Sequence, residues 1–295
     1  MKQADFSTWM RHELDAVEAA LHAWVPADAP AGLGEAMRYG VLDGGKRLRP
    51  LLVLAACDAV EGDHQAGLRA AVAAELIHAY SLVHDDMPCM DNDVLRRGKA
   101  TVHVKFGVSQ AMLAGDAMQA LAFEVLTPSQ GLEPTLQAHL CGLLARAAGH
   151  SGMAGGQAVD LASVGESLDE RALRQMHRRK TGALLQASVM MGAACGPTDN
   201  TAQQALADYG ESIGLAFQVV DDILDVTQDS QVLGKSAGKD QHANKPTYVS
   251  VLGLPAAQAH ARELHAAAMN ALSRSGLAQT NKLAQLADKI IERNH

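Results

Sequence analysis

The chain has 295 residues and a formal net charge of −8, with 48% hydrophobic and only 3% aromatic residues. This acidic balance argues against general nucleic-acid binding, although it permits a local cationic pocket for a small anion. With so few aromatic side chains the core must consist mainly of Ala, Leu, Val and Met, and an alanine-rich sequence favours helices.

Helical periodicity covers most of the chain. Apolar residues at helical spacing predict a first helix over residues 6–24, which Pro26 ends. Further helices are expected over residues 32–40, from Pro50 onward, and over 66–86, 101–126, 134–149, 168–191, 202–226, 255–273 and 280–293. No stretch alternates as a strand does, and no repeat of 20–50 residues is visible. We therefore expect one all-α domain spanning residues 1–295.

The chain shows no sign of secretion or membrane insertion. Its amino-terminal residues are polar and lack the apolar stretch of a signal peptide. No run approaches the roughly 18 apolar residues of a membrane span. The four cysteines are widely spaced, without a C-x-x-C pair, which predicts reduced thiols. We expect a cytoplasmic protein with no integral membrane segment.

A basic segment, Gly44-Gly45-Lys46-Arg47-Leu48-Arg49-Pro50, precedes the third expected helix. Its glycines free the backbone, and proline suits the first turn of a helix. Lys46 and Arg49 therefore lie at the mouth of that helix. The segment is either a solvated basic turn or a clamp for an anion.

An acidic cluster, Asp85-Asp86-Met87-Pro88-Cys89-Met90-Asp91, follows the apolar helix 66–86. Asp85 and Asp91 would point apart on a continuous helix. Pro88 interrupts helical geometry, so the chain can loop round and bring Asp91 back beside Asp85. His78 lies two helical turns before Asp85 and on the same face, about 10 Å away.

A second acidic cluster, Asp221-Asp222-Ile223-Leu224-Asp225, lies on the helix expected over residues 202–226. Asp221 and Asp225 share a helix face because they are four residues apart. Carboxylates without a Cys or His cage suit Mg²⁺, which substrate phosphates usually complete. Arginines such as Arg96 and Arg97 suit the phosphate itself. The two clusters together predict a Mg²⁺–diphosphate site.

Three further segments add polar groups. Gln157 and Asp160 follow a glycine-rich stretch and are either partners of the site or ordinary packing residues. Lys180 and Thr181, within a mainly apolar helix, are plausible phosphate contacts. Leu233-Gly234-Lys235 begins a glycine-rich cationic segment, but it lacks the spacing of a P-loop.

Together these motifs resemble those of the trans-isoprenyl diphosphate synthases, the polyprenyl synthetase family, and in particular its bacterial farnesyl diphosphate synthases. The resemblance covers the chain from Gly44 to about Tyr248 by motif and extends beyond it by length. The motifs that carry it are Gly44 to Pro50, His84 to Asp93, Arg96-Arg97-Gly98, Gly155-Gly156-Gln157, His177 to Gly182, Phe217 to Asp225 and Leu233-Gly234-Lys235.

The resemblance implies an isoprenoid synthase fold, one large helical bundle around a deep central cavity, usually as a homodimer. The Mg²⁺ ligands would be Asp85, Asp86, Asp91, Asp221 and Asp225. Asp222 belongs to the second motif without being assigned as a ligand. Isopentenyl diphosphate would contact Lys46, Arg49, His78 and Arg97. The allylic diphosphate would contact Arg96, Lys180, Thr181, Gln218, Lys235 and Lys245. Catalysis is expected from Asp85, Asp86, Asp91, Arg96, Lys180, Asp221 and Lys235.

The expected reaction is the Mg²⁺-dependent condensation of isopentenyl diphosphate with dimethylallyl and geranyl diphosphates, giving (2E,6E)-farnesyl diphosphate and diphosphate. Tyr80 lies about 7.5 Å down the helix axis from Asp85, where a bulky ring would stop a growing chain early. The small Ser81 beside it leaves room for an intermediate length. Tyr80 could instead be a packing residue of the core.

Three alternatives remain. A geranylgeranyl diphosphate synthase of the same fold is one, because the Pro-Cys-Met-Asp-Asn-Asp string also occurs in some of these enzymes. A terpene cyclase usually has an aromatic-lined cavity and one diphosphate site, which the low aromatic content and the cations Lys46, Arg49 and His78 argue against. A non-catalytic helical subunit would be expected to lack an acidic cluster, and both are present here.

Overall fold

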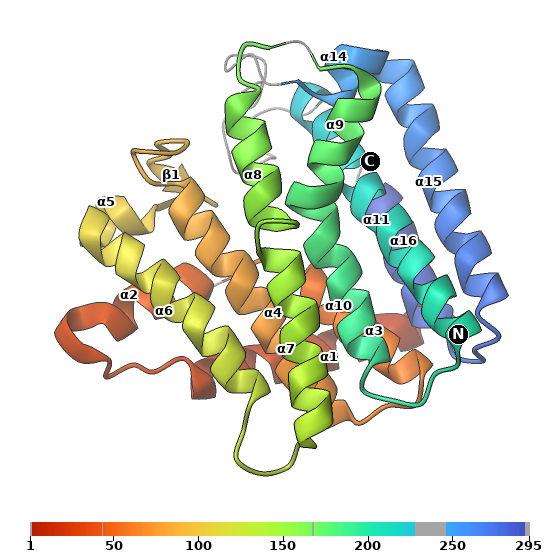
Figure 1. Cartoon of the computed structure of the whole chain (residues 1–295), viewed down its shortest axis with the longest axis horizontal. Coiled ribbons are helices and arrows are strands. Elements are labelled where there is room, and N and C mark those ends of the chain that lie inside the picture. The colour runs from red at the N-terminus through yellow and green to blue at the C-terminus, as the bar shows by residue number, and fades with distance from the viewer. Residues whose placement is uncertain (1, 43, 167, 228–245, 293–295) are drawn as a thin grey trace.

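The computed structural model describes residues 2–42, 44–166, 168–227 and 246–292, with the side chains of residues 2–4 left aside. The predicted all-α architecture is confirmed, since long helices pack side by side over this part of the chain (Figure 1). None of the helices in these ranges has the length and hydropathy needed to cross a bilayer.

The elements in chain order are α1 (Lys2–Trp24), η1 (Pro30–Gly32), α2 (Leu33–Val41), α3 (Leu48–Ala59), α4 (His64–Asp85), β1 (Leu95–Arg96), β2 (Lys99–Ala100), α5 (Val102–Phe106), α6 (Val108–Leu126), α7 (Pro134–Ala148), α8 (Met153–Ala162), α9 (Glu170–His177), η2 (Arg178–Gly182), α10 (Ala183–Ala193), α11 (Asn200–Thr227), α14 (Tyr248–Leu252), α15 (Leu254–Arg274) and α16 (Asn281–Ile291).

Helix α4 passes through the middle of the bundle and ends at the first acidic cluster. Asp63 caps its start, because the carboxylate accepts hydrogen bonds from the backbone N–H groups of Gln65 and Ala66 at 2.7 and 3.2 Å. Small alanine side chains let α3, α6 and α10 pack closely around it. These alanines are all buried: Ala66, Ala70, Ala71, Ala73, Ala74 and Ala79. The packing fixes Asp85, the last residue of α4, at one end of the core.

Two of the expected helices are interrupted. Residues 101–126 form α5 and α6, separated at Gly107, whose φ of +91° is rare for residues with a side chain. Residues 168–191 contain η2, a π-helical turn over residues 178–182. A short antiparallel hairpin of β1 and β2 was not predicted, because strands of two residues are too short to show alternation.

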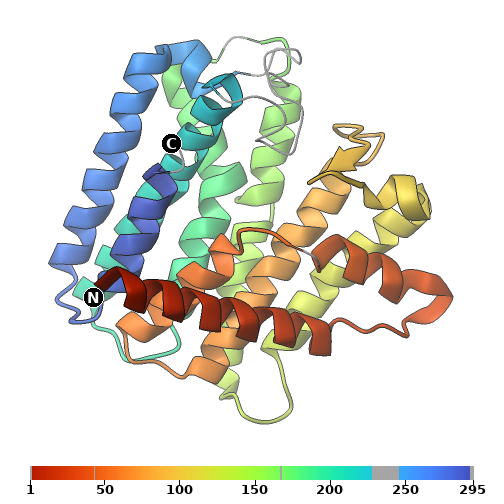
Figure 2. The same ribbon diagram turned by 180° about the vertical axis from the view of Figure 1, so that it is seen from behind.

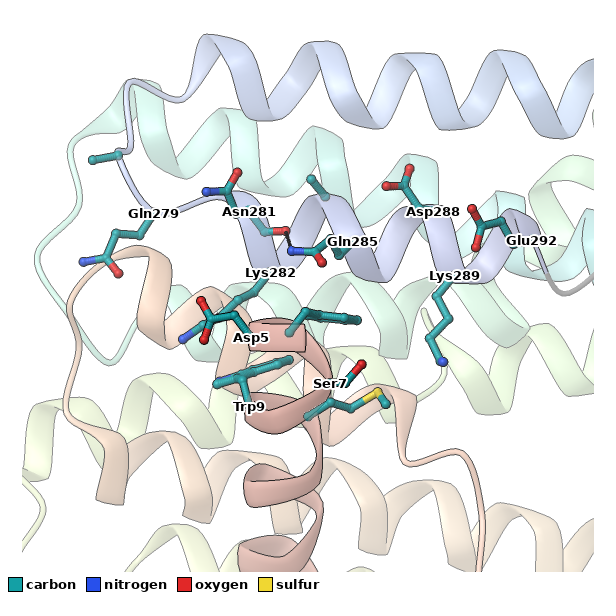
Figure 3. A pocket seen from close by; sticks show the side chains of 14 residues that line it. Asp5, Ser7, Trp9, Gln279, Asn281, Lys282, Gln285, Asp288, Lys289 and Glu292 are labelled. Carbon is teal, nitrogen blue, oxygen red and sulfur yellow. Dashed lines mark hydrogen bonds between the residues drawn. The ribbon is translucent and has the colours of Figure 1, made fainter. Parts of the chain in front are cut away.

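The two ends of the described chain meet away from the acidic clusters. Figure 2 shows α1 running across the bundle with its amino-terminal end beside α16. A groove of about 650 Å³ lies between these helices (Figure 3). Lys282 spans part of it, 2.6 Å from Asp58 and over the ring of Trp9. None of the motif residues lines this groove, so its size does not make it the functional site.

Candidate active site

A cavity of about 380 Å³ lies between α3, α4, α8 and η2. Arg49 lines it from α3, His78 and Asp85 from α4, and Lys180 and Thr181 from η2. Residues predicted for the isopentenyl site and for the allylic site therefore border one space. The remaining lining residues are Tyr80, Ser81, Leu82, His84, Met90, Met153, Ala154, Gln157, Ala158 and Leu161.

The first acidic cluster folds back on itself where α4 ends. The backbone N–H of Asp91 donates to the carbonyl of Asp85 at 2.9 Å, and that of Asn92 donates to the carbonyl of Met87 at 3.0 Å. Asn92 has a φ of +52°, a left-handed conformation that asparagine tolerates better than most residues. The prediction that the chain turns at Pro88 and returns Asp91 to Asp85 is confirmed.

The carboxyl group of Asp85 lies in an unfavourable environment for its charge. Burial raises the pKa of Asp85 to about 6. The ammonium of Lys180 opposes this rise in the pKa, whereas the charge of Asp91 adds to it. A divalent cation at this place would supply the positive charge that the two carboxylates lack.

Asp86 is bound by Arg96 from the β1–β2 hairpin. Nε and Nη2 of Arg96 donate to the two carboxylate oxygens at 2.8 and 2.6 Å, and Asp86 is only 3% exposed. The residue predicted as a metal ligand and the residue predicted as a diphosphate contact thus bind each other. The pair fixes the orientation of the Asp86 carboxylate and leaves a second lone pair on each of its oxygens.

Helix α8 packs directly on the η2 turn. A Cβ atom at Gly156 would lie 2.1 Å from the backbone nitrogen of Lys180, so only glycine permits this approach. Lys180 Nζ donates to Asp160 Oδ2 at 2.5 Å. Asp160 is therefore a partner of the predicted phosphate-binding lysine, one of the two alternatives left open by the sequence. The amide of Gln157 is buried and has no partner among the described residues.

A line of hydrogen bonds connects the second acidic cluster to the cavity. The Thr181 hydroxyl donates to Gln218 Oε1, and Gln218 Nε2 donates to Asp222 Oδ1, both at 2.8 Å. Asp222 Oδ2 accepts the backbone N–H of Tyr248 at 2.8 Å. Asp222 thus holds neighbouring groups in place.

Asp221 and Asp225 belong to the second acidic cluster. They lie one turn apart on α11, which is continuous from Asn200 to Thr227, so they share a face as predicted. The charge of Asp221 acts on the guanidinium of Arg49, so the second cluster lies within electrostatic range of this cavity residue.

The donor set fits Mg²⁺ completed by a substrate. Within the described ranges, no group of three or more acidic, His or Cys side chains could hold a metal ion alone. The carboxylates of the two clusters, among them Asp85, Asp91 and Asp221, instead suit an ion that takes further oxygens from diphosphate and water.

The cationic end of the cavity contains Arg49 and His78. Arg49 is buried, its Nε has no partner among the described residues, and burial lowers its pKa to about 10. The pKa of His78 lies well below its usual value because of burial and then because of the charge of Arg49. His78 is therefore neutral at pH 7 and can donate or accept a hydrogen bond. Lys235 and Lys245, predicted for the allylic site, lie outside the described residues.

The hairpin contacts the Gly44–Pro50 segment. Arg97 Nη1 donates to the carbonyl of Gly44, which brings Arg97 beside the exposed Lys46. Arg47 turns inward and binds Glu75 at 2.7 Å. Arg47 is therefore bound inside the protein, and its burial fixes the start of α3.

Tyr80 and Ser81 line the cavity one turn below Asp85, where the chain-length floor was predicted. His84 packs edge-on against the Tyr80 ring, with centroids 5.7 Å apart, and its Nε2 lies 3.0 Å from the carbonyl of Met112. A Cβ atom at Gly115 would lie 2.0 Å from that nitrogen. Sequence reasoning missed this support from α6, and a glycine inside an apolar helical pattern was the signal available for it.

This chain is similar to known proteins in sequence and in fold. A sequence model of the family described as "Polyprenyl synthetase" matches residues 30–286. A chloroplastic heterodimeric geranylgeranyl pyrophosphate synthase large subunit of Arabidopsis thaliana is 45% identical over 274 residues, covering 91% of this chain and 74% of that protein. The crystal structure of an FPP/GFPP synthase from Zymomonas mobilis is similar with a TM-score of 0.87 and 40% identity, covering 99% of this chain and 100% of the other. A geranyltransferase from Helicobacter pylori, complexed with magnesium and isoprenyl diphosphate, has a TM-score of 0.86 and 33% identity, covering 97% of each chain.

Proposed function

This chain belongs to the polyprenyl synthetase family and is a prenyltransferase of isoprenoid biosynthesis, and from that premise we propose its reaction. It condenses isopentenyl diphosphate with dimethylallyl and then geranyl diphosphate, giving (2E,6E)-farnesyl diphosphate and releasing diphosphate. The whole chain, residues 1–295, forms one such domain, and the reaction depends on Mg²⁺.

The shared cavity is the observation that supports two diphosphate substrates. Arg49 and His78 border it on one side and Lys180 and Thr181 on another, with Asp85 at the end of α4. A terpene cyclase needs only one diphosphate site, and a helical subunit without activity needs none. The side chains of Met153 and Leu161 give this cavity apolar surface for the hydrocarbon parts of the substrates.

The allylic diphosphate is assigned to the acidic end of the cavity. Asp85, Asp86 and Asp91 of the first cluster, with Asp221 and Asp225 of the second, would hold Mg²⁺. When bound, Mg²⁺ supplies positive charge to the departing diphosphate. Lys180, already oriented by Asp160, adds a fixed cation there.

The bond changes follow from this placement. The C–O bond of the allylic diphosphate breaks, and its electron pair leaves with the diphosphate. The double bond of isopentenyl diphosphate, whose own diphosphate is held by Lys46, Arg49, His78 and Arg97, attacks the allylic cation. Loss of one proton, taken by the released diphosphate, restores a double bond in the longer chain. Holding both substrates in one cavity supplies much of the rate enhancement.

Tyr80 supports the C15 product, because its ring lies among the lining residues below Asp85. A second candidate product is geranylgeranyl diphosphate. The specific observation in its favour is the similarity to the geranylgeranyl pyrophosphate synthase subunit of Arabidopsis thaliana. Both products require the same site and differ only in how far the cavity extends past Tyr80.

A homodimer is the proposed assembly. Helix α6 presents apolar side chains that are about half exposed in the single chain, Val108 at 48%, Met112 at 42% and Leu113 at 53%. A second copy would bury this surface. Sedimentation of the purified protein tests the proposal, and a monomer at micromolar concentration would refute it.

Product analysis tests the reaction. The purified protein is incubated with dimethylallyl and isopentenyl diphosphates and Mg²⁺, and the products are dephosphorylated and separated by chromatography. Farnesol supports the proposed reaction and the Tyr80 floor, whereas geranylgeraniol supports the reaction and moves the floor. No condensation by folded protein would refute the proposed reaction. Reactions with EDTA and with Asp85→Ala serve as negative controls.

A further inference from the structure

We propose that Tyr248 is a positioning residue of the allylic site, holding α11 and the η2 turn together through its backbone and its ring. The inference rests on the proposed function, since it assigns a role in binding Mg²⁺–diphosphate. Tyr248 is the first residue of α14 and lies outside the cavity lining, so it acts through other residues.

The backbone of Tyr248 reaches the second acidic cluster. Its N–H donates to Asp222 Oδ2 at 2.8 Å, and the other oxygen of that carboxylate accepts Gln218 Nε2. Gln218 in turn accepts the hydroxyl of Thr181, which lines the cavity. A shift of the Tyr248 backbone therefore changes the direction of a carboxylate, an amide and a hydroxyl in succession.

The ring of Tyr248 reaches the η2 turn by a second route. It is fully buried and stacks on His177 with centroids 5.4 Å apart and an interplanar angle of 26°. His177 is the last residue of α9 and directly precedes the turn that contains Lys180 and Thr181. The stack fixes both the start of that turn and the orientation of the Tyr248 N–H.

The stack acts by shape and not by hydrogen bonding. The Tyr248 hydroxyl and both ring nitrogens of His177 are buried without a partner among the described residues. Burial also lowers the pKa of His177 to about 4, so its ring is neutral at pH 7. A phenylalanine ring at position 248 can therefore replace tyrosine, whereas leucine removes the planar partner.

Calorimetric binding of inorganic diphosphate in the presence of Mg²⁺ tests this role without requiring turnover. We expect Tyr248→Phe to bind within 2-fold of wild type and Tyr248→Leu to bind about 10-fold more weakly. In steady-state assays Tyr248→Leu should raise the KM for the allylic diphosphate by a similar factor, while the KM for isopentenyl diphosphate stays within 2-fold. Phe should not lower the Tm, because it removes a buried hydroxyl that lacks a partner.

Tyr209 provides a matched control. It is also a fully buried tyrosine, but its hydroxyl donates to the carbonyl of Leu283 at 2.7 Å, away from the cavity. Tyr209→Leu should lower the Tm and leave diphosphate binding unchanged. If Tyr248→Leu behaves in the same way, or if Tyr248→Phe is as defective as Tyr248→Leu, the proposal is wrong.

A second variant covers failure of Tyr248→Leu to fold. His177→Leu removes the other ring of the stack and should weaken diphosphate binding selectively, whereas unchanged binding overturns the proposal. Absence of condensation by the wild type, with Mg²⁺–diphosphate binding and its dependence on Tyr248 intact, would refute the proposed reaction and leave the positioning role standing. If the wild type condenses its substrates but Mg²⁺–diphosphate binding does not depend on Tyr248, only the positioning role is refuted.

Discussion

Asp85→Asn is expected to stabilise the metal-free protein while it removes most turnover. Burial raises the pKa of the Asp85 carboxyl from 3.8 to about 6, so the folded state resists ionising this group. A difference of about 2.2 pKa units, at 1.36 kcal/mol for each, corresponds to about 3 kcal/mol of unfolding free energy. Asparagine keeps the size of the side chain and does not ionise, so it avoids this cost.

The pH dependence gives the sign of the effect. Well below pH 3.8 the carboxyl group of Asp85 is protonated in both states, and the variant gains nothing from its amide. As the pH rises from 3.8 to about 6, the unfolded chain ionises first, so the wild type loses stability. Above pH 6 the full difference of about 3 kcal/mol remains, equivalent to about 6 °C in Tm.

Urea denaturation in EDTA, at several pH values from 4 to 7.5, measures this difference between wild type and variant. Asp208→Asn is the control, because Asp208 is only partly buried and hydrogen bonds from Gln204 and Arg274 lower its pKa. The control should lose rather than gain stability above pH 4. An Asp85→Asn variant no more stable at pH 7 than at pH 4, relative to wild type, would refute the assigned cause. Turnover should fall about 100-fold or more with the charge removed.

Three further outcomes are expected. Tyr80→Ala should lengthen the product, measured by chromatography of the dephosphorylated alcohols, and continued arrest at C15 would place the floor elsewhere. Gly115→Ala should displace His84 and lower the unfolding free energy by about 1–3 kcal/mol, and an unchanged denaturation midpoint would contradict that contact. Arg96→Lys should weaken the bidentate pair with Asp86, costing about 1–3 kcal/mol in a double-mutant cycle. If the effects of changing Arg96 and of changing Asp86 on the unfolding free energy are additive, the pair contributes nothing to stability.

Cations of the proposed allylic site are held in place before a substrate arrives. Arg96 is fixed by the carboxylate of Asp86, and Lys180 is fixed by Asp160. Such pairs reduce the rearrangement needed when diphosphate binds, which is the advantage of preorganised charge in catalysis. The two pairs are separate, so removing Asp86 should loosen only Arg96, and removing Asp160 should loosen only Lys180.

Sequence alone determined the helices, the all-α fold and the two acidic clusters of this protein. These features depend on local periodicity, on breaks such as Pro88 and on a spacing of four residues between Asp221 and Asp225. The return of Asp91 to Asp85 was also predictable, because a short loop after a proline has few paths. The expected substrates came from the family resemblance, because hydrophobic periodicity does not identify a substrate.

Only the tertiary structure decided which groups the charged side chains bind. Arg96 pairs with Asp86 through a hairpin too short to predict, and Lys180 pairs with Asp160 because Gly156 lets two helices touch. Arg47 turns inward to Glu75, although Lys46 beside it stays exposed. The physical reason is that a charged side chain forms hydrogen bonds only with groups that packing brings to within about 3 Å. Residues far apart in sequence come this close only after the helices have packed.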